Sequence, residues 1–275
     1  MDLDDEDAKA FVAFEHAGWE NVAERYHRHW GGLTQQSAEA LLDATGVSEG
    51  ARVLDVATGA GYVAAAAAKR GAQVTGLDFS AQQVALAMRS CPEVAFIKGS
   101  AAELPFPKAT FDAVVMGFGM LHMPDAQAVV HEAFRVLKPG GRYGFTVWAD
   151  PKPGEGFGIV MPVLSQQGDP NPDLPPAPPY FRFADPVEVS NVLGAAGFTA
   201  IQTKTVPQFL RLSDPNDLYQ AFLKGAVRAS AMLRAQPEDR LESIRHAIRK
   251  EVEKLRDGKE FLVPMPASLS SGLKP

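Results

Sequence analysis

The sequence predicts an α/β fold: a Rossmann-like, doubly wound, seven-stranded, mostly parallel sheet with helices on both faces, plus helical cap and lid insertions. Three observations predict it. Strand-like and helix-like segments alternate between residues 52 and 148, which is typical of βαβ units in a sheet covered on both faces. Glycines follow the first strand directly, where it turns into a helix. Two more strand-like segments, 199–212 and 261–273, bring the total to seven.

Residues 1–46 are expected to form an N-terminal helical cap. An amphipathic helix is predicted over 8–30, with Gly31-Gly32 as its stop, and a shorter helix over 34–46. The first helix is predicted because apolar side chains recur along it at helical spacing. These side chains are Phe11, Phe14, Trp19, Val22 and Tyr26.

From residue 52 onward the chain alternates strands and helices. Each predicted strand is short, rich in apolar residues and followed by a glycine, a capping residue or a loop. Right-handed crossovers would place the helices on both faces of the sheet. The strands are expected at 52–57, 73–78, 94–97, 111–116 and 142–148, and the helices at 62–70, 80–89, 125–137 and 186–196.

The main domain, 47–275, is expected to carry two insertions. Nine of the chain's 21 prolines fall within 151–182, so this segment is predicted to be an irregular, lid-like loop. Residues 214–258 are predicted to form a helical insertion before the last strand. Its first helix is expected to begin at Asp214-Pro215 and its second near Pro237.

Residues 53–61 carry the densest chemical signal, Val-Leu-Asp-Val-Ala-Thr-Gly-Ala-Gly. Glycine lets the backbone approach a ligand closely, and the free N–H groups of a helix N-terminus bind an anionic group. A tight strand-to-helix turn with no ligand is the alternative. Asp78, at the end of the second strand, can accept both ribose hydroxyls of an adenosyl ligand. Its alternative role is a helix cap, in competition with Ser80.

Further segments follow in a characteristic order. They are 53–61, 74–80, Leu104-Pro105-Phe106, 111–114, Leu121-His122 and 132–141. In this order they resemble the class I S-adenosylmethionine-dependent methyltransferases, specifically the group related to ubiquinone and menaquinone biosynthesis methyltransferases. The resemblance covers about residues 45–150 and resumes weakly at 183–198 and at the final strand.

The resemblance implies S-adenosyl-L-methionine as cofactor and S-adenosyl-L-homocysteine as product. No metal is expected, because no set of His, Asp and Glu residues has the spacing of a metal site. Asp55 and the backbone of the glycine turn would hold the methionine part, Asp78 the ribose and Phe79 the adenine. Ser100 stands where the family often has an aspartate for the adenine amino group, so that contact is weakened. Ala57 replaces the first motif glycine, as in the menaquinone-type variant. The full implied set is Asp55, Ala57, Thr58, Gly59, Gly61, Asp78, Phe79, Gln83, Ser100, Ala101 and Gly117.

The expected reaction is methyl transfer to a small hydrophobic or aromatic molecule. Because the sulfonium is already activated, alignment and exclusion of water can carry much of an in-line displacement, and a general base is optional. His122 and Tyr26 are the candidate catalytic residues, with packing as the alternative for both. Apolar side chains expected around the acceptor are Phe118, Met120, Met123, Trp148, Phe157, Met161, Phe181 and Phe222.

Two other functions share these features. An NAD-dependent oxidoreductase would also use the glycine turn and Asp78, but the chain shows no Tyr-x-x-x-Lys or comparable hydride-transfer set. The second alternative is a non-catalytic or repurposed member of the fold that binds the cofactor without transferring its methyl group. Cofactor titration and an acceptor screen separate the three.

Charge and cysteine content limit the partners. Lys+Arg 27 against Asp+Glu 33 gives a net charge of −6, which disfavours polymeric nucleic acid and anionic membranes. Cys91 is the only cysteine, so no intrachain disulfide is expected. The acidic stretch 1–7 is unlike a signal peptide, and a cytoplasmic protein is expected. Helix 237–256 offers a face either for the cap or for a homodimer contact.

Overall fold

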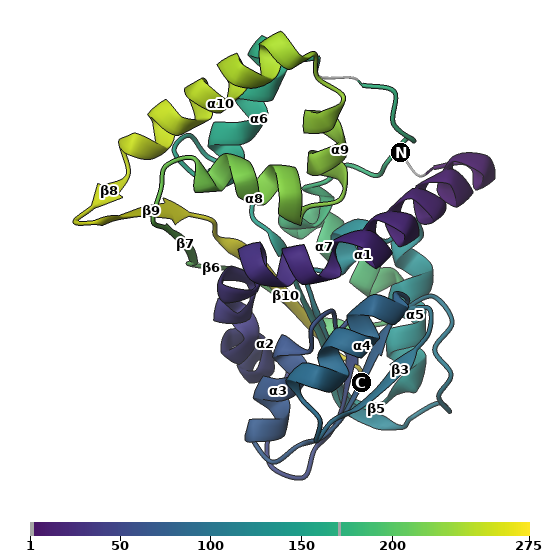
Figure 1. Ribbon diagram of the computed structural model, residues 1–275. Helices are drawn as coiled ribbons and strands as arrows, with labels where there is room; N and C mark the ends of the chain where they lie inside the picture. The colour runs from purple at the N-terminus through teal and green to yellow at the C-terminus, as the bar shows by residue number, and fades with distance from the viewer. Residues whose placement is uncertain (1–2, 170–171) are drawn as a thin grey trace.

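The computed structural model describes residues 3–169 and 172–275 (Figure 1). In this part of the chain, seven strands form the main sheet: β1 (Arg52–Val56), β2 (Gln73–Asp78), β3 (Ala95–Lys98), β4 (Phe111–Gly117), β5 (Leu137–Trp148), β6 (Thr199–Val206) and β10 (Ala267–Leu273). Their order is β3-β2-β1-β4-β5-β10-β6. Only β10 is antiparallel, to both of its neighbours, among these described strands. The seven-stranded, mostly parallel sheet expected from the sequence is confirmed.

Helices cover both faces of this sheet. They are α2 (Ala38–Ala44), α3 (Tyr62–Lys69) and α4 (Ala81–Ser90) on one face, and α5 (Ala126–Val136) and α7 (Pro186–Ala195) on the other. The central strands point alternate side chains to opposite faces. Val53 and Val115 therefore pack in a cluster with α2 and α3, whereas Leu54 and Val114 pack in a larger cluster with α5 and α7. The doubly wound arrangement is confirmed.

The strand order reverses beside β1, which has β2 on one side and β4 on the other. The chain passes from β1 to β2 and β3, and only then crosses to β4. Open α/β sheets bind ligands in the crevice at the carboxyl ends of the strands around such a reversal. The topology therefore favours a ligand site just beyond Val56, Asp78 and Gly117.

Helix α1 (Asp5–Thr34) runs between α4 and α8 (Asp217–Gly225) and separates the sheet from the remaining helices (Figure 1). It is longer than predicted, and the prediction that Gly31-Gly32 ends it is wrong. Gly31 is buried against Tyr62, at a place where a Cβ would overlap the tyrosine hydroxyl. The glycine serves close packing of the helix and does not terminate it.

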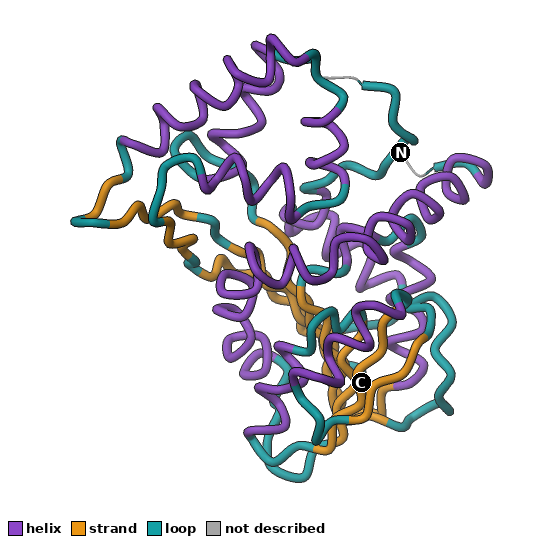
Figure 2. The backbone as a smooth tube through the Cα atoms, viewed as in Figure 1, coloured by secondary structure: helices purple, strands orange, loops and turns teal. Residues whose placement is uncertain are grey.

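Beyond α1, the helices α6 (Gly156–Gln167), α8, α9 (Arg228–Arg234) and α10 (Glu238–Glu253) form a separate layer (Figure 2). Helix α10 begins directly after Pro237, as expected. The predicted first helix of this insertion is wrong in two ways, because α8 begins at Asp217 and α9 is separate. Asp214 accepts a hydrogen bond from the Asn216 N–H in a turn before α8, and the chain bends again at Gly225, which packs on Trp30.

The proline-rich segment 151–182 is not an irregular loop throughout, so that prediction is wrong for α6. Pro162 lies inside α6 and removes one of its backbone hydrogen bonds. Burial of an apolar face against α10 and the core outweighs this loss. The buried residues of that face are Phe157, Ile159, Val160 and Leu164. Pro170 and Asn171, within the same segment, lie outside the described residues.

A second, three-stranded sheet was not predicted. It joins β7 (Phe209–Leu212), β9 (Glu260–Pro264) and β8 (Arg256–Asp257) in the order β7-β9-β8. The single strands predicted over 199–212 and 261–273 are therefore each divided between the two sheets. Pro207 and Pro266 lie at the two divisions, where a residue without an N–H cannot continue a ladder.

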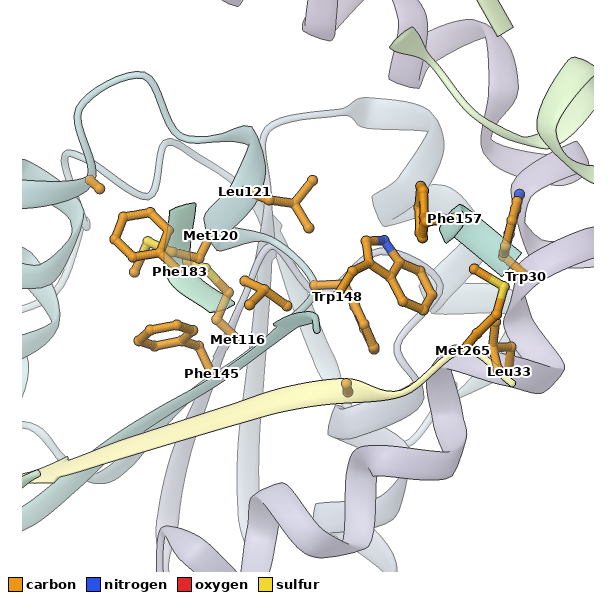
Figure 3. Close-up of a cluster of buried hydrophobic side chains, with 14 of the residues drawn as sticks. Trp30, Leu33, Met116, Met120, Leu121, Phe145, Trp148, Phe157, Phe183 and Met265 are labelled. Atoms are coloured by element: carbon orange, nitrogen blue, oxygen red, sulfur yellow. The ribbon is translucent and has the colours of Figure 1, made fainter. Parts of the chain in front are cut away.

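A continuous apolar core connects the sheet to the helical layer (Figure 3). Trp148, at the end of β5, lies between the side chains of β4 and those of α6 and α1. Its ring centroid is 5.4 Å from that of Phe157 and 6.0 Å from that of Trp30. The helical layer is thus held against the carboxyl edge of the sheet by buried aromatic contacts.

Gly31 and Gly32 provide a matched test of how closely α1 is packed. Gly31→Ala forces Tyr62 to move, so the free energy of unfolding should fall by about 1–3 kcal/mol. Gly32→Ala meets no atom within 4 Å and adds a helix former, so it should raise that free energy by up to about 1 kcal/mol. Urea unfolding followed by circular dichroism measures both, and equal changes in the two variants would contradict the packing of Gly31 on Tyr62.

Candidate active site

A cavity of about 220 Å³ opens beyond β1, β2 and β4, beneath α1. We call it the outer cavity. The structure brings together around it every predicted site residue except Gly61. Those that line it are Tyr26, Asp55, Ala57, Thr58, Gly59, Asp78, Phe79, Gln83, Ser100, Ala101, Gly117 and His122.

The two glycines of the turn have different surroundings. Both have positive φ, +55° at Gly59 and +84° at Gly61. A Cβ on Gly61 would lie 3.2 Å from the Phe96 ring, so its small size serves packing against β3. A Cβ on Gly59 would meet nothing closer than 3.9 Å and would occupy the outer cavity instead. Gly59 therefore leaves open space where a ligand can approach the backbone.

Asp55 ties β1 to α3. Its Oδ2 accepts hydrogen bonds from the Thr58 hydroxyl at 2.6 Å and from the Ala64 N–H at 3.0 Å. Helix α3 has Gly61 at its N-cap, which has no side chain to cap it, so the strand aspartate supplies the acceptor. The other oxygen, Oδ1, is buried without a hydrogen-bond partner. Burial raises the pKa of Asp55 to about 7.

Asp78 connects the glycine turn to the end of β2. Its Oδ2 accepts from the Gly59 N–H and its Oδ1 from the Ser80 N–H, both at 2.9 Å. Ser80, and not Asp78, caps α4 by accepting from the Gln83 N–H. Burial raises the pKa of Asp78 to about 6. Each carboxylate oxygen keeps a second lone pair that a ligand hydroxyl can use.

Helix α1 covers the Asp78 side of the outer cavity. His16 makes an edge-to-face contact with Phe79, with ring centroids 5.4 Å apart. Glu20 Oε1 accepts from the Ala81 N–H at 2.6 Å and so joins α1 to the start of α4. Ser100 Oγ accepts from the Ala102 N–H at 3.2 Å, which leaves this hydroxyl able to make one further contact.

Two residues of the site have a strained backbone. Ala57 and Phe118 have φ of +53° and +57°, in the left-handed region that costs a residue with a Cβ about 1 kcal/mol or more. Phe118 is held there by its N–H, which donates to Thr146 O at 3.0 Å. Its ring lies 4.3 Å from that of Trp148 between centroids. The strain places the Phe118 side chain at the inner wall of the outer cavity.

His122 is paired with Glu15, a residue that the sequence analysis did not single out. His122 Nδ1 lies 2.9 Å from Oε2 of the Glu15 carboxylate, which is 2% exposed, and Trp19 Nε1 donates to the same oxygen at 3.0 Å. Nδ1 is thus the ring nitrogen that faces Glu15. A signal existed, because Glu15 falls on the apolar stripe of α1 between Phe11 and Trp19.

Tyr26 lines the same wall of the cavity. Its ring packs edge-to-face on Trp19, with centroids 4.9 Å apart. Burial raises the pKa of Tyr26 well above its usual value, so the phenol stays protonated at neutral pH. Nearby, Tyr62 is hydrogen-bonded to His27 Nδ1, and burial raises the pKa of Tyr62 to about 12.

A smaller, aromatic pocket of about 40 Å³ adjoins the outer cavity and shares Trp19, Tyr26, Phe118 and His122 with it. We call it the inner pocket. Its other lining residues are Trp30, Trp148, Phe157, Tyr180, Phe222, Ala226, Val227, Arg228 and Ala229.

Five of the eight apolar side chains expected around the acceptor line one of the two spaces. Phe118 and Met123 line the outer cavity, and Phe118, Trp148, Phe157 and Phe222 line the inner pocket. Met120, Met161 and Phe181 line neither, because they pack into the main core instead. The position of an apolar residue in the sequence does not show whether its side chain faces a cavity or the core.

No group of three or more His, Cys, Asp or Glu side chains among the described residues is arranged to hold a metal ion. No helix within 3–169 or 172–275 has the length and apolar character needed to cross a membrane.

Comparison with known proteins gives one consistent result. Residues 53–141 match a family described as "Methyltransferase domain". A demethylmenaquinone methyltransferase of Beutenbergia cavernae is 42% identical over 111 residues, covering 40% of this chain and 46% of that protein. Residues 53–141 are therefore similar to a methyltransferase domain, and the chain spans about half the length of the curated relatives it matches.

Solved structures share the fold across most of the chain. The YcgJ protein of Bacillus subtilis has a TM-score of 0.56 at 22% identity, covering 86% of this chain and 97% of that one. Phosphoethanolamine N-methyltransferase 2 of Haemonchus contortus, in complex with S-adenosyl-L-methionine, has a TM-score of 0.57 at 19% identity, covering 93% and 57%. The Rossmann-like fold of class I methyltransferases is thereby confirmed.

The raised pKa of Asp55 predicts an inverse pH dependence of stability. Between its unfolded pKa near 4 and its folded value of about 7, the folded state holds more protons, so the free energy of unfolding falls as pH rises. Asp55→Asn should remove about 2 kcal/mol of this fall between pH 5 and 7. Urea titrations at several pH values, with Asp257→Asn as an exposed control, measure it; parallel curves for wild type and Asp55→Asn would contradict the assignment.

Proposed function

We propose that this chain, whose residues 53–141 match a methyltransferase domain, transfers the methyl group of S-adenosyl-L-methionine to a small hydrophobic or aromatic acceptor. The observation that carries the proposal is the outer cavity. It combines a buried, unpartnered oxygen of Asp55, an open backbone at Gly59 and the carboxylate of Asp78. These groups match the ammonium, carboxylate and ribose of one ligand.

The residues fit this cofactor. Asp55 Oδ1 would accept from its ammonium, which compensates a buried oxygen that otherwise has no partner. Asp78 would accept from the ribose hydroxyls with the lone pairs that Gly59 and Ser80 leave free. Phe79 and Ser100 would contact the adenine. When bound, S-adenosyl-L-methionine supplies a methyl group on a positively charged sulfur, already activated for transfer.

The remaining residues would align the acceptor and exclude water. The strained Phe118 forms part of the wall shared by the outer cavity and the inner pocket. Helix α1 covers both spaces with Trp19 and Tyr26, so an acceptor among them would be held out of solvent. Tyr26, with its raised pKa, would act as a hydrogen-bond donor or packing group. Positioning of this kind supplies a large share of the rate of a displacement.

His122 is the proposed general base for an acceptor that must lose a proton. Its Nδ1 faces Glu15, and a proton kept on Nδ1 by that carboxylate would leave Nε2 as the acceptor. Glu15 would act as a positioning residue, through the histidine and not on the acceptor. The same arrangement is found in enzymes that use a carboxylate to orient a histidine base.

Isothermal titration with S-adenosyl-L-methionine, S-adenosyl-L-homocysteine and NAD(H) tests the cofactor. Wild type should bind both adenosyl ligands and neither form of NAD. Asp78→Ala should weaken binding by about 100-fold or more, because a carboxylate that accepts from ligand hydroxyls is lost. Asp78→Asn, which keeps an oxygen for the Gly59 N–H, should fold normally and show an intermediate loss, and the exposed Asp257→Ala should match wild type. Binding of NAD alone, or of no ligand, would overturn the proposal.

The base role predicts a selective loss of turnover. With an acceptor found by screening, His122→Asn should lower kcat by about 10²–10⁴-fold and leave S-adenosyl-L-homocysteine binding unchanged. His131→Asn, an exposed histidine on α5, is the matched control and should keep full turnover. Near-normal kcat for His122→Asn would remove this residue from the chemistry while leaving the cofactor assignment intact.

A further inference from the structure

Arg228 stands out among the side chains around the inner pocket. It is the first residue of α9, and its side chain is half-buried among the aromatic rings that line the pocket. The methyl-transfer mechanism described above does not use a cation at this place. An arginine in an aromatic pocket therefore calls for a separate explanation.

The Arg228 guanidinium has little compensation from the protein. Nη1 donates to the Pro175 carbonyl at 2.8 Å, which leaves most of its five N–H donors without a protein acceptor. No carboxylate of the described residues forms an ion pair with it within 4.0 Å. Burial lowers the pKa of Arg228 from its usual value, and only the more distant charge of Glu15 opposes this effect.

One oxygen of Glu15, Oε2, is already occupied. It lies 2.9 Å from His122 Nδ1 and accepts from Trp19 Nε1 at 3.0 Å. Glu15 lines the outer cavity and Arg228 the inner pocket, and no ion pair within 4.0 Å joins the two side chains. A half-buried guanidinium with unused donors is the usual receptor for a carboxylate or similar planar anion.

We infer that the methyl acceptor carries an anionic group, a carboxylate in particular, which Arg228 binds while the aromatic ring of the acceptor lies against the wall that the inner pocket shares with the outer cavity. The inference rests on the proposed function, because it concerns the acceptor of that reaction. The reacting atom of the acceptor then lies toward the wall formed by Phe118 and His122, which the inner pocket shares with the outer cavity.

The lining chemistry favours an aromatic anion over two other ligands. An ammonium ion would gain cation–π contacts with the rings but would be repelled by Arg228. A neutral ring would pack equally well against Trp148 and Phe157. It would, however, displace water from the inner pocket without giving the Arg228 guanidinium an acceptor. An aromatic carboxylate would pack against the rings of the inner pocket and also pair with the Arg228 guanidinium.

Matched ligands test this inference by binding, independently of methyl transfer. The probes are 4-hydroxybenzoate, 4-hydroxybenzamide and 4-hydroxybenzylamine, with 6-hydroxy-2-naphthoate and its amide as a two-ring pair, each titrated with S-adenosyl-L-homocysteine present. All three tryptophans of the chain line the inner pocket, so quenching of tryptophan fluorescence reports occupancy there. At least one carboxylate should bind tenfold or more tightly than its amide.

Variants on the same helix separate charge recognition from structure. Arg228→Gln should abolish the preference for carboxylate over amide, whereas Arg228→Lys should keep part of it. Arg234→Gln removes an exposed arginine of α9 that lines neither space, and it should behave as wild type. Thermal unfolding of all three confirms that the helix is intact.

The outcomes are distinguishable. Equal binding of acid and amide, tighter binding of the amine, no binding of either carboxylate, or an unchanged preference in Arg228→Gln would each overturn the inference and leave the proposed function standing. Failure of S-adenosyl-L-homocysteine itself to bind would overturn the proposed function, and the inference with it.

Discussion

The rest of the site depends on one buried carboxylate, that of Asp55. From the middle of the sheet it accepts hydrogen bonds from Thr58 and from the first turn of α3, whose own N-cap is a glycine. This bond fixes where the chain turns after β1 and so where Gly59 presents its backbone. The Gly59 N–H in turn donates to Asp78 on the neighbouring strand. Two strands, a turn and a helix are thereby held in one hydrogen-bonded unit.

Helix α1 completes the site from outside the sheet. Its stripe of Val12, Glu15, Trp19 and Tyr26 faces the outer cavity, and close packing of Gly31 on Tyr62 sets how near the helix can lie. Through this helix a buried glutamate reaches a histidine more than 100 residues away in sequence. The pair proposed as base and positioning residue therefore comes together only when α1 docks.

The two spaces of the site have different origins in the chain. The outer cavity is lined mostly by residues within 53–141, at the turns after β1, β2 and β4. The inner pocket adds α1, α6, α8, α9 and Tyr180, from the N-terminal cap and the insertions, to Phe118, His122 and Trp148 of the main domain. Under the proposed function, the sheet would bind the cofactor and the added helices would contribute most of the acceptor site.

The sequence by itself determined the sheet and most of the residues that meet at the outer cavity. Alternating strands, a glycine turn and an aspartate at the next strand end are local patterns, and a parallel sheet brings successive carboxyl ends to one edge. Twelve of the thirteen candidate residues consequently meet at one cavity. The sequence did not reveal α6, because the many prolines of segment 151–182 predicted a loop where burial stabilises a helix. It also did not reveal that two predicted strands are each divided between two sheets.

Only the tertiary structure decided which residues line the inner pocket. Glu15, Arg228 and the choice among the aromatic residues depend on which helix faces meet across the chain, and spacing within a segment carries no such information. The role of Gly31 is a further example, since a glycine that stops a helix and one that permits close packing look alike in sequence. The physical reason is the same in each case: local propensity acts within a few residues, whereas burial and charge compensation are set by partners that only the fold brings together.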